Sequence, residues 1–297
     1  MVRRALITGA TGGLGRVLVP LLLENGYAVR ATGRDSTIGA ELASQGAQFY
    51  AADLAETDPA PMTSGIDVVF HLAALSSPWG RREIFHAVNV EATRRLLAAA
   101  KSAGCSAFIY ASTPSIYAER RNRLGITERA DLPARFANDY AATKFAAERA
   151  VLSADEPGFR TLALRPRAIV GQFDTVLLPR LLRAARLGRI MIPGDGKALI
   201  ELTDARDVAA AFLAADRTGA HGQAVNISGG QPRPLHALLE RIFAELGLSV
   251  ALRRLPVPIA LAAASLAETV AALLPGRPEP PVTRYSVMTF AFSQTFD

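Results

Sequence analysis

The residues best suited to chemistry are a tyrosine and a lysine in the segment YAATK at 140–144. Tyr140 and Lys144 stand four residues apart, a spacing that brings both side chains to one face of a helix. A neighbouring positive charge favours the phenolate, so we expect Lys144 to lower the pKa of Tyr140 and to let it give or take a proton. Only three of the 33 basic residues are lysines, which indicates that position 144 needs an ammonium in particular. Alone, this spacing is more often a chance pair on a helix. A glycine-rich loop near the N-terminus favours the catalytic interpretation here.

That loop follows a short apolar run at 5–8 and leads directly into a helical segment that begins near Arg16. Glycines at i, i+3 and i+6 let the backbone turn sharply and approach a pyrophosphate, while the helix N-terminus presents free N–H groups to the anion. A glycine-rich turn without a ligand is the less favoured interpretation in this context. The loop therefore predicts a dinucleotide site with the contact residues Gly9, Thr11, Gly12, Gly13, Leu14 and Gly15.

The end of the second predicted strand indicates which dinucleotide is bound. An acidic residue there would hold a ribose 2′-hydroxyl, but Gly33 occupies the tip and Arg34 follows it. An arginine can accept a 2′-phosphate through paired charge-assisted hydrogen bonds, so NADP(H) is favoured over NAD(H). Two alternatives stay open: Arg34 is a solvated surface residue, or Asp35 turns inward toward the ribose.

Further cofactor contacts are expected after the third and fourth strands. Asp53 and Leu54 are placed to border the adenine ring, with Asp53 accepting from its exocyclic amine; a simple turn cap is the alternative for Asp53. Ala73 and Ala74 have the small side chains that a backbone lying against the cofactor requires.

These residues need a scaffold, and the first half of the chain alternates apolar runs with helical spacings. The predicted strands are 5–8, 28–32, 48–52, 68–72, 107–112 and 161–164, and the predicted helices between them are 17–24, 84–100 and 140–152. Near-continuous apolar strands are typical of a parallel sheet covered on both faces. The pattern predicts an α/β fold with a doubly wound, Rossmann-type parallel sheet.

We expect a dinucleotide-binding domain over 1–165 and a smaller substrate-binding region over 166–297, interleaved with the sheet rather than tethered to it. The second half is interrupted by glycine and proline, with helices predicted near 207–215 and 235–246. The run 255–275 carries one charge, Glu268, and its length invites a transmembrane interpretation. Its alanines, Ser265 and Thr269 favour a helix packed over a pocket, with contact to a membrane surface as a less favoured alternative.

Composition narrows the class of protein. The 297 residues are half apolar, which is enough for a full core, and a single cysteine, Cys105, excludes a disulfide framework. No N-terminal export signal is recognised, so a cytoplasmic location is expected. The net charge of +6 is spread along the chain without a basic block, so no nucleic-acid partner is expected. The four histidines lack paired ligand spacing, and no metal site is expected.

Taken together, the glycine loop, Asp53-Leu54, the run 108–113 and the Tyr140/Lys144 pair resemble the extended branch of the short-chain dehydrogenase/reductases. The resemblance covers essentially the whole chain. The runs LSSPWG at 75–80, STPS at 112–115 and PPVTR at 280–284 are similar to the 3β-hydroxysteroid dehydrogenase-like group, which includes 2-alkyl-3-oxoalkanoate reductases. Members act on bulky apolar ketones or alcohols.

The resemblance implies a role for several residues. Thr113 would hold the substrate oxygen, with Ser112 and Ser115 as rivals, while Tyr140 supplies the proton and Lys144 holds Tyr140 and the cofactor ribose. Asn89 would shape the site, with a surface asparagine as the alternative, and the backbone around Pro166 would lie beside the nicotinamide. Relatives usually add a final helix, so we expect the C-terminal end to be shortened. Many members pair as homodimers, and the oligomeric state of this chain stays open because one sequence shows no interface.

The function expected first is therefore reduction of a hydrophobic ketone or oxidation of the alcohol, with an apolar substrate enclosed by Trp79, Phe136, Phe173 and the 255–274 segment. A nucleotide-sugar epimerase or dehydratase is the alternative, and it would need basic residues for a diphosphate. Candidates for that role are Arg180, Arg183, Arg186 and Arg206. A sensor that binds NADP(H) without turnover is the third hypothesis, and it has no use for the Tyr140/Lys144 pair.

Overall fold

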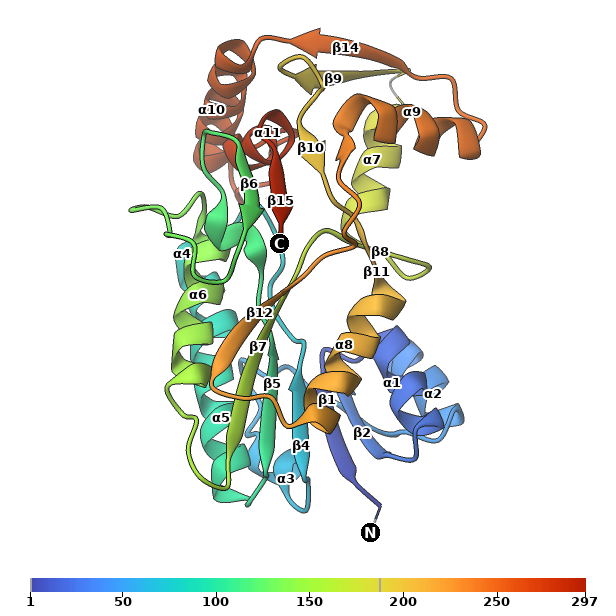
Figure 1. Cartoon of the computed structure of the whole chain (residues 1–297), viewed down its shortest axis with the longest axis vertical. Coiled ribbons are helices and arrows are strands. Elements are labelled where there is room, and N and C mark those ends of the chain that lie inside the picture. Colours follow the sequence, from blue (N-terminus) through green and yellow to red (C-terminus); the bar gives the residue numbers. More distant parts are fainter. Residues whose placement is uncertain (1, 187) are drawn as a thin grey trace.

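The computed structural model describes residues 2–186 and 188–297, and its centre is a parallel sheet of seven strands (Figure 1). The strand order is β12-β7-β5-β4-β1-β2-β3. Successive strands are added on one side of β1 up to β3 and on its other side from β4 onward, as the doubly wound prediction requires. The carboxyl ends of β1, β4 and β5 therefore meet at one edge, where ligands bind in such sheets. The strands are β1 Arg4–Thr8, β2 Ala28–Gly33, β3 Gln48–Ala51, β4 Val68–His71, β5 Ala107–Ala111, β7 Arg160–Pro166 and β12 Gln223–Ile227.

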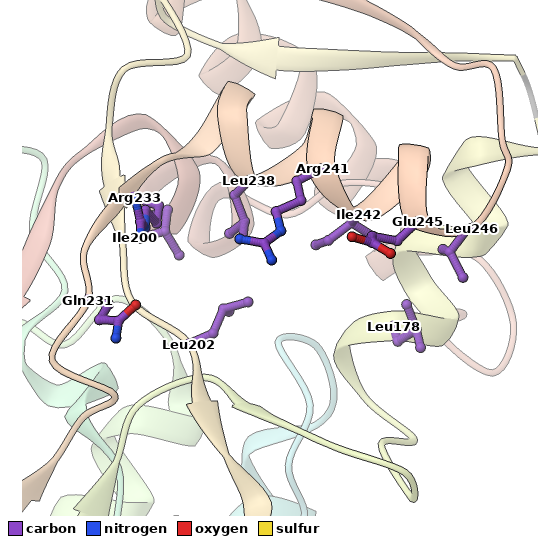
Figure 2. Close-up of a pocket in the computed structure, with 10 residues that line it drawn as sticks. All are labelled: Leu178, Ile200, Leu202, Gln231, Arg233, Leu238, Arg241, Ile242, Glu245 and Leu246. Atoms are coloured by element: carbon purple, nitrogen blue, oxygen red, sulfur yellow. The ribbon is translucent and has the colours of Figure 1, made fainter.

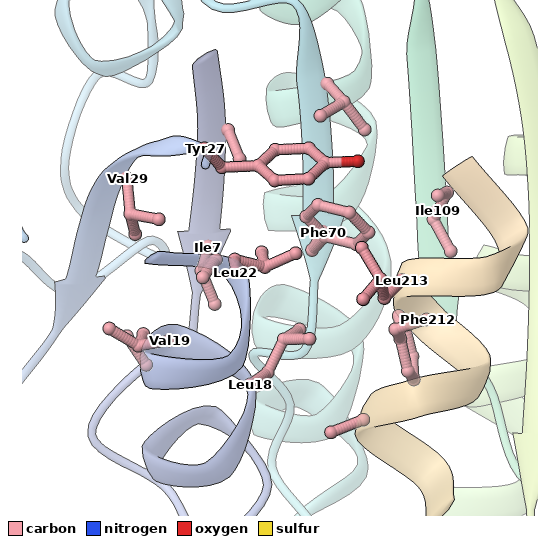
Figure 3. Close-up of a cluster of buried hydrophobic side chains, with 14 of the residues drawn as sticks. Ile7, Leu18, Val19, Leu22, Tyr27, Val29, Phe70, Ile109, Phe212 and Leu213 are labelled. Carbon is pink, nitrogen blue, oxygen red and sulfur yellow. The ribbon is translucent and has the colours of Figure 1, made fainter. Parts of the chain in front are cut away.

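Helices cover both faces of this sheet. Helices α1 (Gly15–Glu24), α2 (Ser36–Ser44) and α8 (Ala205–Thr218) lie on one face, and α3 (Ala60–Thr63), α5 (Ala92–Ser102) and α6 (Asp139–Leu152) lie on the other (Figure 1). The first face buries a continuous apolar cluster in which Leu18 and Leu22 of α1 lie near Phe70 of β4 and Phe212 of α8 (Figure 3). Burial on both faces explains why the strands read as unbroken apolar runs.

The predicted elements of the first half are confirmed, with one difference. The segment expected as a single helix over 84–100 is divided into α4 (Arg82–His86), a π-helical turn (Ala87–Glu91) and α5. A π turn widens the helix by one residue, and such turns often occur at functional sites. The one here contains Asn89.

The second half contributes α8 and β12 to the central fold and builds a smaller region beyond the carboxyl edge (Figure 1). Within residues 2–186 and 188–297, four strand pairs and four helices form it, with β6 supplied by the first half, and Leu235, Leu239 and Phe243 of α9 lie in its own apolar cluster. The division at residue 165 stays a prediction. The elements are β6 Arg123–Ile126, β8 Ile169–Val170, α7 Leu177–Ala185, β9 Arg189–Pro193, β10 Leu199–Ile200, β11 Thr203–Asp204, β13 Arg233–Pro234, α9 Leu235–Glu245, β14 Ala251–Leu255, α10 Val257–Leu273, α11 Arg284–Ala291 and β15 Gln294–Phe296.

Helix α10 accounts for the apolar run at 255–275. It buries Ala260 and Ala264 in a cluster with Val287 of α11, while Leu266 and Leu273 on another side are exposed. The helix thus packs on α11 through its small residues, and its place over a pocket stays a prediction. Within the described ranges, no helix is long and apolar enough to cross a membrane.

Candidate active site

Tyr140, Lys144 and Thr113 gather at the carboxyl edge of the sheet. Helix α6 begins after Asn138, whose side chain caps it by accepting a hydrogen bond from the N–H of Ala141. Tyr140 lies in the first turn and is partly exposed, whereas Lys144, one turn further on, is 2% exposed. Thr113 lies two residues after the end of β5 and caps the short 3₁₀ helix Pro114–Tyr117. The local sequence therefore fixes the start of both elements that carry the candidate residues.

The ammonium of Lys144 is held under the site. Its Nζ donates to the carbonyl oxygen of Ala111 at the end of β5 and lies 4.0 Å from the ring centroid of Tyr110. Burial lowers the pKa of Lys144 from 10.5 to about 7, and the carboxylate of Glu148 acts in the opposite direction. Near neutral pH, Lys144 therefore exchanges its proton readily.

This pKa predicts how the stability of the cofactor-free protein depends on pH. Above pH 7 the unfolded chain keeps the Lys144 proton that the folded chain has lost, so the free energy of unfolding rises with pH up to about 10.5. The slope contributed by this group is at most about 1.4 kcal/mol per pH unit. Between pH 7 and 9 we expect wild type to gain about 2 kcal/mol relative to Lys144→Met in urea unfolding. Parallel pH profiles of the two proteins would contradict this assignment.

The expected lowering of the Tyr140 pKa is not found. Burial is the main cause that raises it, and the phenol of Tyr285 adds to the rise; the hydroxyls of Ser76 and Thr113 act in the opposite direction. Lys144 does not supply the expected shift because its ammonium is directed to Ala111 and its own charge is partly lost to burial. The pKa of Tyr140 thus lies above its ordinary value, which favours the phenol, the form that donates a proton.

A chain of hydroxyls continues from Thr113 into the second half of the molecule. The Thr113 hydroxyl donates to Ser115 Oγ at 3.0 Å, and Ser115 Oγ lies 2.6 Å from the phenol oxygen of Tyr285 on α11. Ser112 takes no part in this chain, because its hydroxyl donates to the buried carboxylate of Glu148 at 2.6 Å. Thr113 and Ser115 are thus the hydroxyls that remain directed to the site, and Tyr285 joins them without having been predicted.

Asn89 is buried and connects the elements around the site. Its Oδ1 accepts from the N–H of Leu75 at 2.7 Å, and its Nδ2 donates to Thr143 Oγ1 at 3.2 Å. The π turn brings Asn89 to this position, so the segment after β4 is attached to the helix that carries Tyr140 and Lys144. The alternative of a surface asparagine is thereby excluded.

The glycine loop has the close backbone packing that a pyrophosphate cradle needs. Gly9 has a φ of +67°, and a Cβ there would lie 2.7 Å from the Ala73 nitrogen; at Gly15 it would lie 2.5 Å from Ala10 backbone atoms. The Ala73 backbone therefore lies against the loop, and its contact with the cofactor stays a prediction. Gly13 packs against the carbonyl of Phe173, whose ring stacks with Arg16 at 3.9 Å. The loop, in which a Cβ at Gly12 would lie 3.2 Å from the carbonyl oxygen of Gly9, is followed directly by α1 and fits a dinucleotide phosphate.

The residues expected near the adenosine end of the cofactor lie in different surroundings, from solvent to the apolar core. The Arg34 side chain is 77% exposed and lies 3.7 Å from the Asp53 carboxylate. Asp35 does not turn inward, because its Oδ1 accepts from two backbone N–H groups and caps α2. Asp53 Oδ1 accepts from the N–H of Ala55, the turn-cap alternative, and Leu54 packs against the apolar cluster beneath the sheet. Thr11 closely approaches Gly33, so the tip of β2 has no room for a larger side chain.

The aromatic residues expected to enclose the substrate have other partners. Phe136 packs against Phe145 with ring centroids 5.3 Å apart, Phe173 contacts the glycine loop, and Trp79 Nε1 donates to the carbonyl of Arg277. A cavity of about 430 Å³ lies instead beside α7 and α9, lined by Leu178, Leu202 and Ile242 among others (Figure 2). None of the residues that line it is a predicted catalytic or cofactor residue.

Comparison with known proteins agrees with this geometry. Residues 5–228 match the NAD dependent epimerase/dehydratase family. The chain is 36% identical to the uncharacterized protein YbjS of Escherichia coli (99% of this chain, 89% of that protein). It is 34% identical to the 2-alkyl-3-oxoalkanoate reductase of Stenotrophomonas maltophilia (95% and 87%). Among solved structures, MoeE5 in complex with UDP-glucose and NAD superposes with a TM-score of 0.73 at 30% identity, covering 85% of each chain.

Proposed function

The chain belongs to the NAD dependent epimerase/dehydratase family, and we propose that it is an NADP(H)-dependent oxidoreductase acting on a bulky hydrophobic ketone or the matching secondary alcohol. Family membership makes it an enzyme that binds a nicotinamide dinucleotide, and the glycine loop fits that group. The similarity to a 2-alkyl-3-oxoalkanoate reductase supports the reductase over the other activities of the family.

The chain's own residues would handle the substrate oxygen and its proton. The bound dinucleotide supplies or accepts the hydride. Thr113 donates a hydrogen bond to the ketone oxygen and orients it, and Tyr140 gives that oxygen a proton. Lys144, one turn after Tyr140 on α6 and hydrogen-bonded to the end of β5, would stabilise with its ammonium the negative charge that Tyr140 acquires when it gives up its proton. Asn89 and the π turn hold the segments that carry these groups.

One observation carries the proposal: Tyr140 and the hydroxyl chain from Thr113 to Tyr285 share the carboxyl edge of the sheet with the dinucleotide loop. This arrangement suits proton transfer to a carbonyl. Two of the four arginines considered for a diphosphate have carboxylate partners, since Arg180 pairs with Glu279 and Arg206 with Asp204, and these two give less support to an epimerase.

The assay that tests the proposal follows NADPH absorbance with medium- and long-chain ketones and with UDP-glucose as the competing substrate class. Consumption of NADPH with a ketone is expected. Conversion of the nucleotide sugar without net change in the nicotinamide would instead favour the epimerase alternative, and tight cofactor binding with no turnover of either class would favour the sensor.

Preference for NADP(H) rests on Arg34. With Asp35 committed to the helix cap and no space for a larger side chain at position 33, no acidic group is directed to the ribose from the end of β2 in the described residues. We expect Arg34→Gln to weaken NADPH binding about tenfold or more and to leave NADH binding unchanged, as measured by fluorescence titration. Arg94→Gln, an exposed arginine on α5, is the matched control. Equal loss for both cofactors would remove the assignment.

A further inference from the structure

The imidazole of His71, at the end of β4, is buried and hydrogen-bonded at both ring nitrogens. The residue is 1% exposed, its Nδ1 lies 2.7 Å from Thr8 Oγ1, and its Nε2 lies 2.8 Å from Thr93 Oγ1. Both threonines are themselves fully buried. The proton transfer described above does not use His71, so these two contacts call for another explanation.

The count of donors and acceptors around His71 fixes which nitrogen carries the ring hydrogen. The single hydroxyl hydrogen of Thr93 goes to the carbonyl oxygen of Asn89 at 2.8 Å, so Thr93 Oγ1 accepts from Nε2–H of His71. Thr8 Oγ1 accepts from the N–H of Ala73 at 3.3 Å and donates its own hydrogen to the bare Nδ1. The opposite tautomer would leave the Thr8 hydrogen without an acceptor among the described residues. Burial lowers the pKa of His71 from 6.5 to about 3, which keeps the ring neutral, as this count requires.

One end of this hydrogen-bond chain lies at the cofactor loop. Thr8 is the last residue of β1 and directly precedes Gly9, where a Cβ would lie 2.7 Å from the Ala73 nitrogen. The N–H of Ala73 donates to the Thr8 hydroxyl, and the N–H of Leu72 donates to the Thr8 carbonyl at 3.2 Å. The Thr8 hydroxyl therefore holds the segment after β4 against the first glycine of the loop. His71 fixes the direction of that hydroxyl by accepting its hydrogen.

The other end lies at the helix that carries the proposed proton donor. The Asn89 carbonyl that accepts from Thr93 belongs to the π turn, and the Asn89 side chain donates to Thr143 Oγ1 at 3.2 Å. Thr143 precedes Lys144 on α6, and its hydroxyl donates to the carbonyl of Tyr140 at 3.1 Å. The bond from His71 to Thr93 therefore acts on the turn that holds α6 in place.

We propose that His71 is a positioning residue with two separable arms. In the cofactor arm, Nδ1 orients the Thr8 hydroxyl and with it the glycine loop; in the helix arm, Nε2–H orients Thr93 and with it Asn89 and α6. The cofactor arm concerns dinucleotide binding, which follows from family membership. The helix arm rests on the proposed function, because it acts on the helix that carries Tyr140. His71 acts through the two threonines and takes no part in proton transfer.

Asparagine and glutamine each reproduce one nitrogen of the ring. The Oδ1 of asparagine stands in the place of Nδ1 and can accept from Thr8, whereas the Nε2 of glutamine reaches the place of the ring Nε2 and can donate to Thr93. His71→Asn should therefore lower kcat for the best ketone of the NADPH assay about tenfold and weaken NADPH binding less. His71→Gln should weaken NADPH binding about tenfold and lower kcat less. His221→Asn and His221→Gln, at an exposed histidine, are the matched controls and should leave both quantities at wild-type values.

The threonines remove each arm from its other side and serve if the His71 variants do not fold. Thr8→Val should reproduce the pattern of His71→Gln, and Thr93→Val that of His71→Asn. Nitrogen-15 NMR of histidine-labelled protein examines the tautomer apart from activity. The His71 signal, identified by its loss in His71→Gln, should show the hydrogen on Nε2 and should not titrate between about pH 5 and 8.

These measurements distinguish failure of the proposal from failure of the proposed function. If no ketone is reduced, but the tautomer is the expected one and NADPH binding weakens more in His71→Gln than in His71→Asn, the proposed function fails and the cofactor arm stands. A hydrogen on Nδ1, or the same ratio of kcat loss to affinity loss in both His71 variants, would overturn the proposal and leave His71 as a packing residue only.

Discussion

Replacing Tyr140 with phenylalanine is expected to lower kcat for ketone reduction by about 10²- to 10⁴-fold, the contribution typical of a positioned acid or base. The change removes one oxygen and keeps the ring, which is partly exposed at the start of α6. Because burial and Tyr285 keep the phenol of Tyr140 protonated, the wild-type group is ready to donate. No other described phenol lies in the first turn of that helix.

Separate measurements of kcat and of NADPH affinity distinguish an effect on proton transfer from an effect on binding. NADPH affinity should change less than threefold in Tyr140→Phe, since the glycine loop and α1 are untouched. Tyr50→Phe, the same substitution on the exposed edge strand β3, should leave both kcat and KM at wild-type values. A kcat within a factor of five of wild type in Tyr140→Phe would show that another group, with Tyr285 the nearest candidate, delivers the proton.

The parts of the site that depend on local sequence could be predicted from the sequence. The glycine loop between β1 and α1 and the four-residue spacing of Tyr140 and Lys144 are set by neighbours along the chain. Apolar runs located the strands to within a residue or two because both faces of the sheet are buried. The π turn at Asn89 was not predicted, since one extra residue in a helical turn barely changes the apolar spacing.

The parts that depend on distant contacts could not be predicted. Ser115 and Tyr285 are 170 residues apart and meet only because α11 packs beside the site. The two partners of His71 lie 63 and 22 residues away along the chain, and its neutral ring is a consequence of burial, which no spacing reveals. Burial also explains the wrong prediction for Tyr140. A lysine four residues away suggests a lowered pKa, but burial raises the pKa of Tyr140 and reduces the positive charge of Lys144.

Glu148 connects the catalytic helix to the strand that ends at Pro166. It lies one turn after Lys144 on α6, is 1% exposed, and accepts hydrogen bonds from Ser112 and from the guanidinium of Arg165. Arg165 in turn donates to the hydroxyl of Tyr117. This buried ion pair fixes α6 against β5 and β7, and with it the distance between Tyr140 and the end of β7.

Glu148→Gln is therefore expected to lower the free energy of unfolding by about 3–5 kcal/mol, because it leaves the buried charge of Arg165 without a counter-charge. Urea unfolding measures the loss. Glu156→Gln, the same change in the exposed pair with Lys101, should cost at most about 1 kcal/mol. Adding Arg165→Met to Glu148→Gln removes the stranded charge and should restore part of the stability. If Glu148→Gln costs no more than Glu156→Gln, the pair does not hold the catalytic helix, and the position of Tyr140 must depend on Asn89 and the π turn instead.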